Sequence, residues 1–218
     1  MGRIEIIGGT PRSVSTLYCV GRNYTAHAQE LGNDVPDQPV IFLKARSALR
    51  PLSSGPLAFP SETFHHELEL VLLIDRGAAL GSQVGWDEVG AVAVGIDLTR
   101  RQVQHRCKER RLPWTPAKSF AGSALVSPFV PRARLGSPVG ALRFTLTVLG
   151  ELRQQGDTTQ MIFDVPTLLT YLASLAPLEA GDLVYTGTPE GVGPITAGDA
   201  FQVSLESGSY RTNYDGRL

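Results

Sequence analysis

Two glutamates and an aspartate are the first residues in this sequence whose types and spacing suggest chemistry. Glu67 and Glu69 stand two apart at the start of the apolar run "ELELVLLI", and Asp97 follows the apolar run "AVAVGI". Alternate side chains of a strand share a face, so the glutamates should lie about 6 to 7 Å apart on one side. Carboxylates suit hard cations, which predicts a Mg²⁺ site, with Mn²⁺ as the other candidate ion. A solvated strand face, or a helix N-cap at Asp97, would give the same pattern.

A histidine, a glutamate and a lysine could supply acid–base chemistry beside such a site. His27 and Glu30 are three apart in the helix-like segment "YTAHAQELG", so the carboxylate can orient the imidazole as a general base. A chance surface pair is the alternative. Lys118, in "PWTPAKSF", is one of only three lysines. It can polarise a carbonyl group or simply extend to solvent.

A basic segment at 100–111 carries six Arg or Lys residues against one Glu. It can hold an anionic substrate or form a solvated basic face. The formal net charge is −1, and no aromatic residues lie between these cations, which argues against nucleic-acid binding.

Short strand-like runs dominate the elements that must position these residues. Seven runs bounded by Gly, Pro, Ser and Asp predict strands: "LYCVG", "PVIFLK", "ELELVLLI", "AVAVGIDL", "LRFTLTVLG", "DLVYTG" and "FQVSLE". The alternation at 142–148, followed by "GE", predicts a hairpin that returns through "LRQQG".

Helices are predicted for "YTAHAQELG", "TRRQVQHRCKERR" and "VPTLLTYLASLA". In the last of these, Leu168, Leu172 and Leu175 should form one packing stripe. These patterns favour a mixed, β-rich α+β fold in one domain over residues 1–218.

Cysteine usage and hydropathy bear on the compartment. Cys19 and Cys107 form no C-x-x-C motif, and Cys19 is expected to pack as a small core residue. No run of about 18 apolar residues and no secretion signal is present, so we predict a cytoplasmic protein without membrane association.

In their order and spacing, several motifs together resemble the fumarylacetoacetate hydrolase domain family. They are "GRNYTAHAQELG", "PVIFLK", "HHELEL", "GIDLTRRQVQ", "LPWTPAKSF", "ELRQQGDTTQMIF" and "LEAGDLVYTGTPEGVG". Within that family the chain looks most similar to the acylpyruvase and oxaloacetate decarboxylase branch. It departs from the family pattern at Gln102, where an acid is common, and at Ala121, where a polar residue is common.

The resemblance implies a mixed β-roll or β-sandwich fold with a few short helices, a homodimer, and one Mg²⁺ or Mn²⁺. It assigns the site residues as follows: metal ligands Glu67, Glu69 and Asp97; catalytic residues His27, Glu30 and Lys118; substrate-pocket residues Arg22, Lys44, Arg101, Gln104 and Thr188.

The corresponding hypothesis is cleavage of a small 2-oxo acid through a metal-bound pyruvate enolate. The His27–Glu30 pair would activate water to hydrolyse an acylpyruvate, with Lys118 at the reacting carbonyl, and loss of CO₂ from oxaloacetate would give the same enolate. One alternative is a 2-hydroxyhepta-2,4-diene-1,7-dioate isomerase or decarboxylase of aromatic catabolism. A different class is a non-catalytic protein that binds a metal or an anion.

Overall fold

The computed structural model describes residues 2–30, 34–54, 59 and 62–218, and its largest element is a curled mixed sheet. Among these residues, seven strands follow the order β4-β3-β13-β7-β8-β9-β5, and β10 also pairs with β8. The β3–β13 and β5–β9 pairs are parallel and the others antiparallel. The bounds are β3 (Leu17–Gly21), β4 (Val40–Lys44), β5 (Leu49–Pro51), β7 (Leu68–Ile74), β8 (Val89–Asp97), β9 (Ala124–Val126), β10 (Val130–Pro131) and β13 (Leu183–Tyr185).

A second, antiparallel sheet has the order β12-β11-β15-β16. Its strands are β11 (Leu142–Val148), β12 (Glu151–Asp157), β15 (Ala200–Ser207) and β16 (Tyr210–Arg217). The predicted hairpin is confirmed, because β11 and β12 pair antiparallel across a turn whose two residues, Leu149 and Gly150, both have positive φ. Two short ribbons complete the strands: β1 (Arg3–Ile4) with β2 (Arg12–Ser13), and β6 (Thr63–His66) with β14 (Gly193–Thr196).

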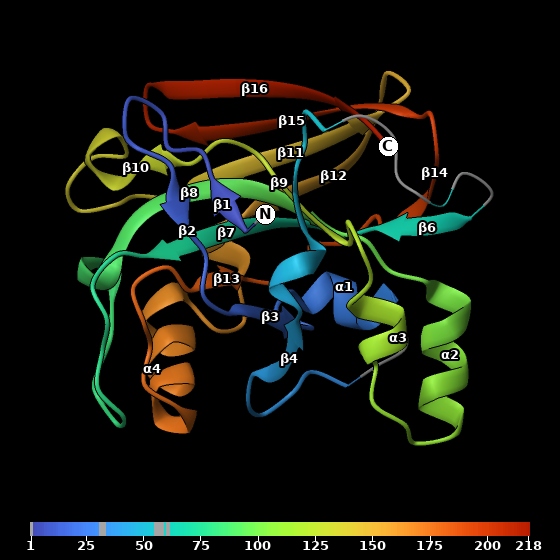
Figure 1. The fold of residues 1–218 in the computed structure, drawn as a ribbon, viewed down its shortest axis with the longest axis horizontal. Coiled ribbons are helices and arrows are strands. Elements are labelled where there is room, and N and C mark those ends of the chain that lie inside the picture. Colours follow the sequence, from blue (N-terminus) through green and yellow to red (C-terminus); the bar gives the residue numbers. More distant parts are fainter. Residues whose placement is uncertain (1, 31–33, 55–58, 60–61) are drawn as a thin grey trace.

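The helices lie on the side of the larger sheet away from the four-stranded sheet (Figure 1). They are α1 (Thr25–Glu30), α2 (Arg101–Glu109), α3 (Thr115–Lys118) and α4 (Val165–Leu175). The prediction that α1 ends at Gly32 falls outside the described residues. No helix in the described part of the chain combines the length and the apolarity needed to cross a membrane.

Helix α4 begins where the sequence indicates and ends one residue before the end of the predicted segment. The Asp164 side chain accepts a hydrogen bond from the Thr167 amide, which caps the helix. Leu168 and Leu172 are buried as expected, but Leu175 is 57% exposed, so its place in the packing stripe was wrong. The reason is positional: Leu175 is the last residue of the helix and projects beyond the core.

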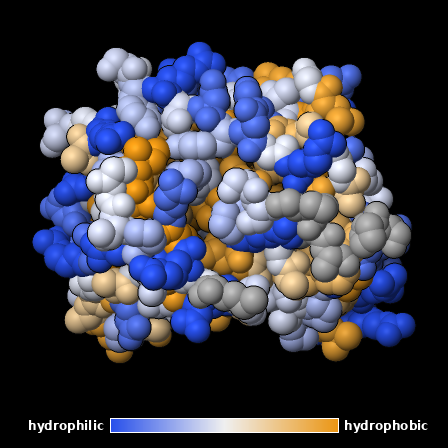
Figure 2. Space-filling model, turned by 45° about the horizontal axis from the view of Figure 1, so that its top comes forward, coloured by the Kyte–Doolittle hydropathy of each residue, from blue (hydrophilic) through white to orange (hydrophobic). Residues whose placement is uncertain are grey.

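The main hydrophobic core fills the space between the two sheets. Buried side chains of β7 and β8 pack in one cluster with those of β11 and β15, among them Leu70, Phe144 and Leu205. Cys19 belongs to a second buried cluster and is a free thiol, which confirms its predicted role as a core residue. On the face shown in Figure 2, polar side chains dominate the rim and apolar atoms show mainly in the recesses.

Candidate active site

Three acidic side chains meet at one end of the larger sheet. Glu69 lies in β7 and Asp97 ends β8, the antiparallel partner of β7. Glu67 lies between β6 and β7 rather than inside one continuous strand, and its carbonyl oxygen accepts a hydrogen bond from the Asp97 amide at 2.8 Å. All three are buried, and one carboxylate oxygen from each lies within 4.8 Å of the other two. The sequence-predicted trio is therefore close enough to share one ion.

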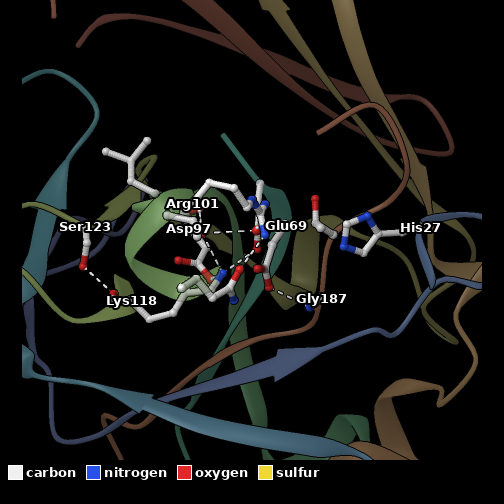
Figure 3. Close-up of polar contacts among 12 residues, drawn as sticks. His27, Glu69, Asp97, Arg101, Lys118, Ser123 and Gly187 are labelled. Carbon is white, nitrogen blue, oxygen red and sulfur yellow. Dashed lines mark hydrogen bonds and ion pairs between the residues drawn. The ribbon is translucent and has the colours of Figure 1, made fainter. Parts of the chain in front are cut away.

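Three cations surround this acid cluster. The Lys118 ammonium donates to Glu67 Oε2 at 2.6 Å, Asp97 Oδ2 at 2.7 Å and Thr99 Oγ1 at 2.7 Å. Arg101 Nη2 donates to Glu67 Oε1 at 2.6 Å. In Figure 3 Lys118 reaches Asp97 from below and Arg101 approaches from above. Buried carboxylates need such partners, because an unpaired buried charge costs several kcal/mol.

Lys44 supports the cluster from beneath and does not line the cavity described below. Its ammonium lies 2.6 Å from Asp97 Oδ1, and both side chains are fully buried. It also donates to the Lys118 carbonyl oxygen and, at 3.1 Å each, to the carbonyl and hydroxyl oxygens of Ser123. The sequence places Lys44 among the substrate contacts; in the structure it lies behind Asp97 and is not among the residues that line that cavity, so a substrate contact for it stays a prediction.

The pKa values of the two glutamates are shifted in opposite directions. Burial raises the pKa of Glu67, but Lys118 and Arg101 outweigh it, so the net pKa is well below its ordinary value. The pKa of Glu69 is raised well above its ordinary value by burial and by the Asp97 and Glu67 carboxylates. Its Oε2 accepts only the Gly187 amide, at 2.6 Å, among the contacts of the described residues. A dication would supply the positive charge that Glu69 lacks, and an all-oxygen donor set fits Mg²⁺ or Mn²⁺.

His27 and Glu30 form the contact that their spacing predicts. Both lie on α1, and His27 Nδ1 is 3.2 Å from Glu30 Oε2. Glu30 Oε1 also accepts the Gly191 amide at 3.2 Å, which ties α1 to the loop after β13. With the carboxylate accepting from Nδ1–H, the other ring nitrogen, Nε2, carries a lone pair and can take a proton. In Figure 3 the imidazole lies beyond Glu69 as seen from Asp97.

A small cavity of about 30 Å³ brings most of the predicted site residues together. His27, Glu67 and Lys118 line it together with four of the five predicted substrate contacts, Arg22, Arg101, Gln104 and Thr188. Lys108 and Trp114 also line it, so all three lysines of the chain lie in or beneath this site. Arg22 has a φ of 59°, a conformation that non-glycine residues rarely adopt. Strain of this kind is typical of functional sites.

Neither of the two residues that depart from the family pattern lines this cavity. Gln102 is exposed and lines a larger cavity of about 610 Å³ beside α2. Ala121 is exposed in the turn before β9.

Sequence reasoning missed residues that hold the acids through backbone or hydroxyl groups. Thr99 Oγ1 donates to Glu67 Oε1 at 3.1 Å, and the Gly187 amide binds Glu69. Gly187 has a φ of 97°, and a Cβ there would come within 2.6 Å of the Asn23 side chain, so only glycine fits. The glycines of "YTGTPEGVG" were the available signal, since glycine often marks a close backbone approach to a site.

This fold, with its acid cluster and facing histidine, defines a class of β-rich enzyme with a site for a divalent metal. Residues 16–213 match the family model described as fumarylacetoacetate (FAA) hydrolase C-terminal, so the chain belongs to that family. The predicted family and α+β fold are confirmed. The chain is an enzyme of this family, so the alternative of a non-catalytic protein that binds a metal or an anion was wrong.

The chain is similar to oxaloacetate tautomerases and to a fumarylpyruvate hydrolase. Over 193 residues the chain is 45% identical to oxaloacetate tautomerase FAHD1, mitochondrial, of Mus musculus, with 87% of this chain and 86% of that protein covered. It is 42% identical over 204 residues to oxaloacetate tautomerase YcgM of Escherichia coli (strain K12), covering 91% and 92%. The crystal structure of a fumarylpyruvate hydrolase from Pseudomonas aeruginosa, in complex with Mn²⁺ and pyruvate, is similar with a TM-score of 0.88 and 36% identity, covering 99% and 94%.

Proposed function

We propose that this chain is a Mg²⁺- or Mn²⁺-dependent enzyme that cleaves small 2-oxo acids, by acylpyruvate hydrolysis, oxaloacetate decarboxylation or both. The observation that carries the proposal is the buried cluster of Glu67, Glu69 and Asp97, part of which opens on the same small cavity as His27. The relatives named for oxaloacetate and fumarylpyruvate chemistry support it.

The three acids would hold the ion. When bound, it supplies a fixed positive charge for the C1 carboxylate and the C2 oxygen of a 2-oxo acid, and so favours the enolate form of the product. The cationic groups that line the cavity, Arg22, Arg101 and Lys108, suit an anionic substrate, and Gln104 and Thr188 add neutral hydrogen-bonding groups.

The His27–Glu30 pair performs the proton transfers. Glu30 holds Nδ1–H, and His27 Nε2 takes a proton from water, which attacks the C4 carbonyl of the acylpyruvate. The C3–C4 bond then breaks, its electron pair passes to pyruvate enolate, and the acyl group leaves as a carboxylic acid. C3 of the enolate receives a proton from the imidazolium, so water is consumed and the base is restored. Lys118 provides positive charge at the developing oxyanion.

A second candidate is interconversion of the keto and enol forms of oxaloacetate, which the names of two relatives favour. That reaction moves a proton off C3 and returns one to the oxygen, so it draws on the same stabilised enolate and the same base. The dienedioate isomerase or decarboxylase remains an alternative, since it would use the same ion with a longer diacid.

The proposal is tested by following three substrates side by side with metal-stripped protein. We expect acylpyruvate hydrolysis and oxaloacetate turnover to be absent in EDTA and restored by Mg²⁺ or Mn²⁺, with separate readouts for pyruvate release and for loss of the enol absorbance. The third substrate is a 2-hydroxy-2,4-dienedioate, and its turnover in a parallel assay would favour the isomerase or decarboxylase alternative. Undiminished turnover in EDTA would refute the metal-dependent mechanism.

We also propose that residues 1–218 form one catalytic domain and that two copies associate. The first part is supported by the core cluster that extends from Val20 to Leu218. The second is supported by apolar surface at the edge strand β4, where Leu43 and the nearby Leu112 are each 53% exposed beside Trp114. Light scattering should give twice the mass of the chain, and a monomer at micromolar concentration would exclude the dimer. The cytoplasmic location stays a prediction.

A further inference from the structure

Gln154 connects the four-stranded sheet to the acid cluster. It lies in β12, is 1% exposed, and was not among the residues that the sequence indicated. Its Oε1 accepts from the Leu68 amide and from His66 Nδ1, both at 2.9 Å. Its Nε2 donates to Thr188 Oγ1 at 2.8 Å and to the Pro189 carbonyl oxygen at 3.0 Å. One buried amide therefore bridges two segments of the site.

Two backbone groups fix the orientation of this amide. The Leu68 amide can only donate and the Pro189 carbonyl can only accept, so the oxygen and nitrogen of Gln154 cannot be exchanged. Because Oε1 accepts from both of its partners, His66 Nδ1 must carry a proton.

The oxygen of Gln154 secures the chain on both sides of Glu67. His66 precedes Glu67 and Leu68 follows it, and both contact the same Oε1. At this point the chain passes from β6, which pairs with β14, into β7. Strand β13, which covers that edge of β7, ends at Tyr185, opposite Val71. Gln154 thus takes the place of a strand partner where Glu67 must be held.

The nitrogen of Gln154 sets the direction of a hydroxyl group in the cavity. Thr188 Oγ1 accepts from Nε2, so its own proton is left for another acceptor. Within the described part of the chain this hydroxyl donates no hydrogen bond to another protein group, and Thr188 lines the cavity. The hydroxyl is therefore presented as a donor to an anionic ligand.

We propose that Gln154 is a positioning residue: its oxygen fixes the backbone that presents Glu67 to the metal, and its nitrogen keeps the Thr188 proton available to the substrate carboxylate. The second half rests on the proposed function. The first half concerns the metal site alone and can be tested without turnover.

The metal arm compares Gln154→Met with Gln155→Met. Methionine keeps the length of the side chain but neither accepts from Leu68 nor contacts His66, whereas Gln155 is exposed on the other face of the same strand. Calorimetric titration with Mn²⁺, without substrate, should show about tenfold weaker binding in Gln154→Met, as is usual for groups that orient metal ligands, and no change in Gln155→Met. A folded Gln154→Met with the affinity of the unsubstituted protein would overturn this half.

The substrate arm uses Gln154→Glu, Thr188→Val and the double variant, with oxaloacetate as the probe. An ionised carboxylate still accepts from Leu68 and His66 but cannot donate, so the Thr188 proton turns toward it. Each single variant should raise KM for oxaloacetate about tenfold with a smaller change in kcat. Because both substitutions remove the same contact, the KM of the double variant should not exceed that of the single variant with the higher KM. Additive losses in the double variant would overturn this half.

The arms also separate this inference from the proposed function. If the unsubstituted protein turns over none of the 2-oxo acids, the function fails while the Mn²⁺ titration still decides the role of Gln154. If turnover is metal-dependent and Gln154→Met changes neither affinity nor KM, the function stands and the inference fails. Should Gln154→Met not fold, Gln154→Asn replaces it in the titration, because its shorter side chain draws the oxygen away from Leu68 and His66 and should weaken Mn²⁺ binding in the same way.

Discussion

Replacing Glu69 with glutamine should lower kcat/KM for every 2-oxo acid substrate by about 10³-fold or more. A bound dication contributes several kcal/mol to transition-state stabilisation, and each 1.36 kcal/mol corresponds to a factor of ten in rate. Glutamine keeps the shape of Glu69 and its contact with the Gly187 amide, but it removes the charge that would face the ion. The loss should appear with acylpyruvate and with oxaloacetate alike, because both reactions depend on the same stabilised enolate.

The same substitution should leave the metal-free protein at least as stable as before. The pKa of Glu69 is raised by burial and by the Asp97 and Glu67 carboxylates, so its charge is costly in the absence of an ion. Thermal unfolding in EDTA should therefore show no loss of Tm, while the rise in Tm on addition of Mn²⁺ should be much reduced. Glu151→Gln, at an exposed position in β12, is the matched control. Mn²⁺-dependent turnover that survives in Glu69→Gln would contradict the assignment of this ligand.

Replacing His27 with glutamine should separate the reactions. Loss of a general base costs about 10² to 10⁴ in rate, and acylpyruvate hydrolysis requires that base to activate water. Decarboxylation of oxaloacetate releases CO₂ without an attacking water, so it should decline much less. Keto–enol interconversion moves a proton and should decline with hydrolysis. Parallel measurement of pyruvate release and enol absorbance distinguishes the three.

His105→Gln provides the control for this experiment, because His105 is exposed on α2 and does not line the cavity. Glu30→Gln should give a partial effect, since the amide no longer holds the His27 ring as a carboxylate does but preserves an oxygen near Nδ1. Equal losses of hydrolysis and decarboxylation in His27→Gln would mean that the histidine serves a step common to both. The division of roles proposed here would then be wrong.

Three cations, Lys44, Lys118 and Arg101, contact the buried acid cluster, but their contacts are distributed unevenly among its three acids. Lys118 and Arg101 compensate Glu67, and Lys44 and Lys118 compensate Asp97, but no cation among the described residues contacts Glu69. Within the described part of the chain, Glu69 is therefore the acid of this cluster that has no direct cation contact. It lies nearest the side from which His27 approaches in Figure 3, so the missing charge and the candidate base occur on the same side of the cluster.

The sequence alone determined the features that depend on neighbours along the chain. Alternating and continuous apolar runs gave the positions of β7, β8 and the β11–β12 hairpin, because the strand period of two is a local property. The acid trio could be selected because two of its members stand two apart before a buried run and the third ends another. The His27–Glu30 contact followed from one turn of helix. The motif order supplied the family.

Only the tertiary structure decided how those acids are held and compensated. Lys118 lies 51 residues from Glu67, and Gln154 lies 86 residues from the Leu68 amide. Likewise Lys44, expected in the substrate pocket, contacts Asp97 beneath it. No local pattern encodes such contacts, because they arise when separate strands and loops pack together. Burial then makes each unpaired polar group costly, so the partners that the chain brings together fix the geometry of the site.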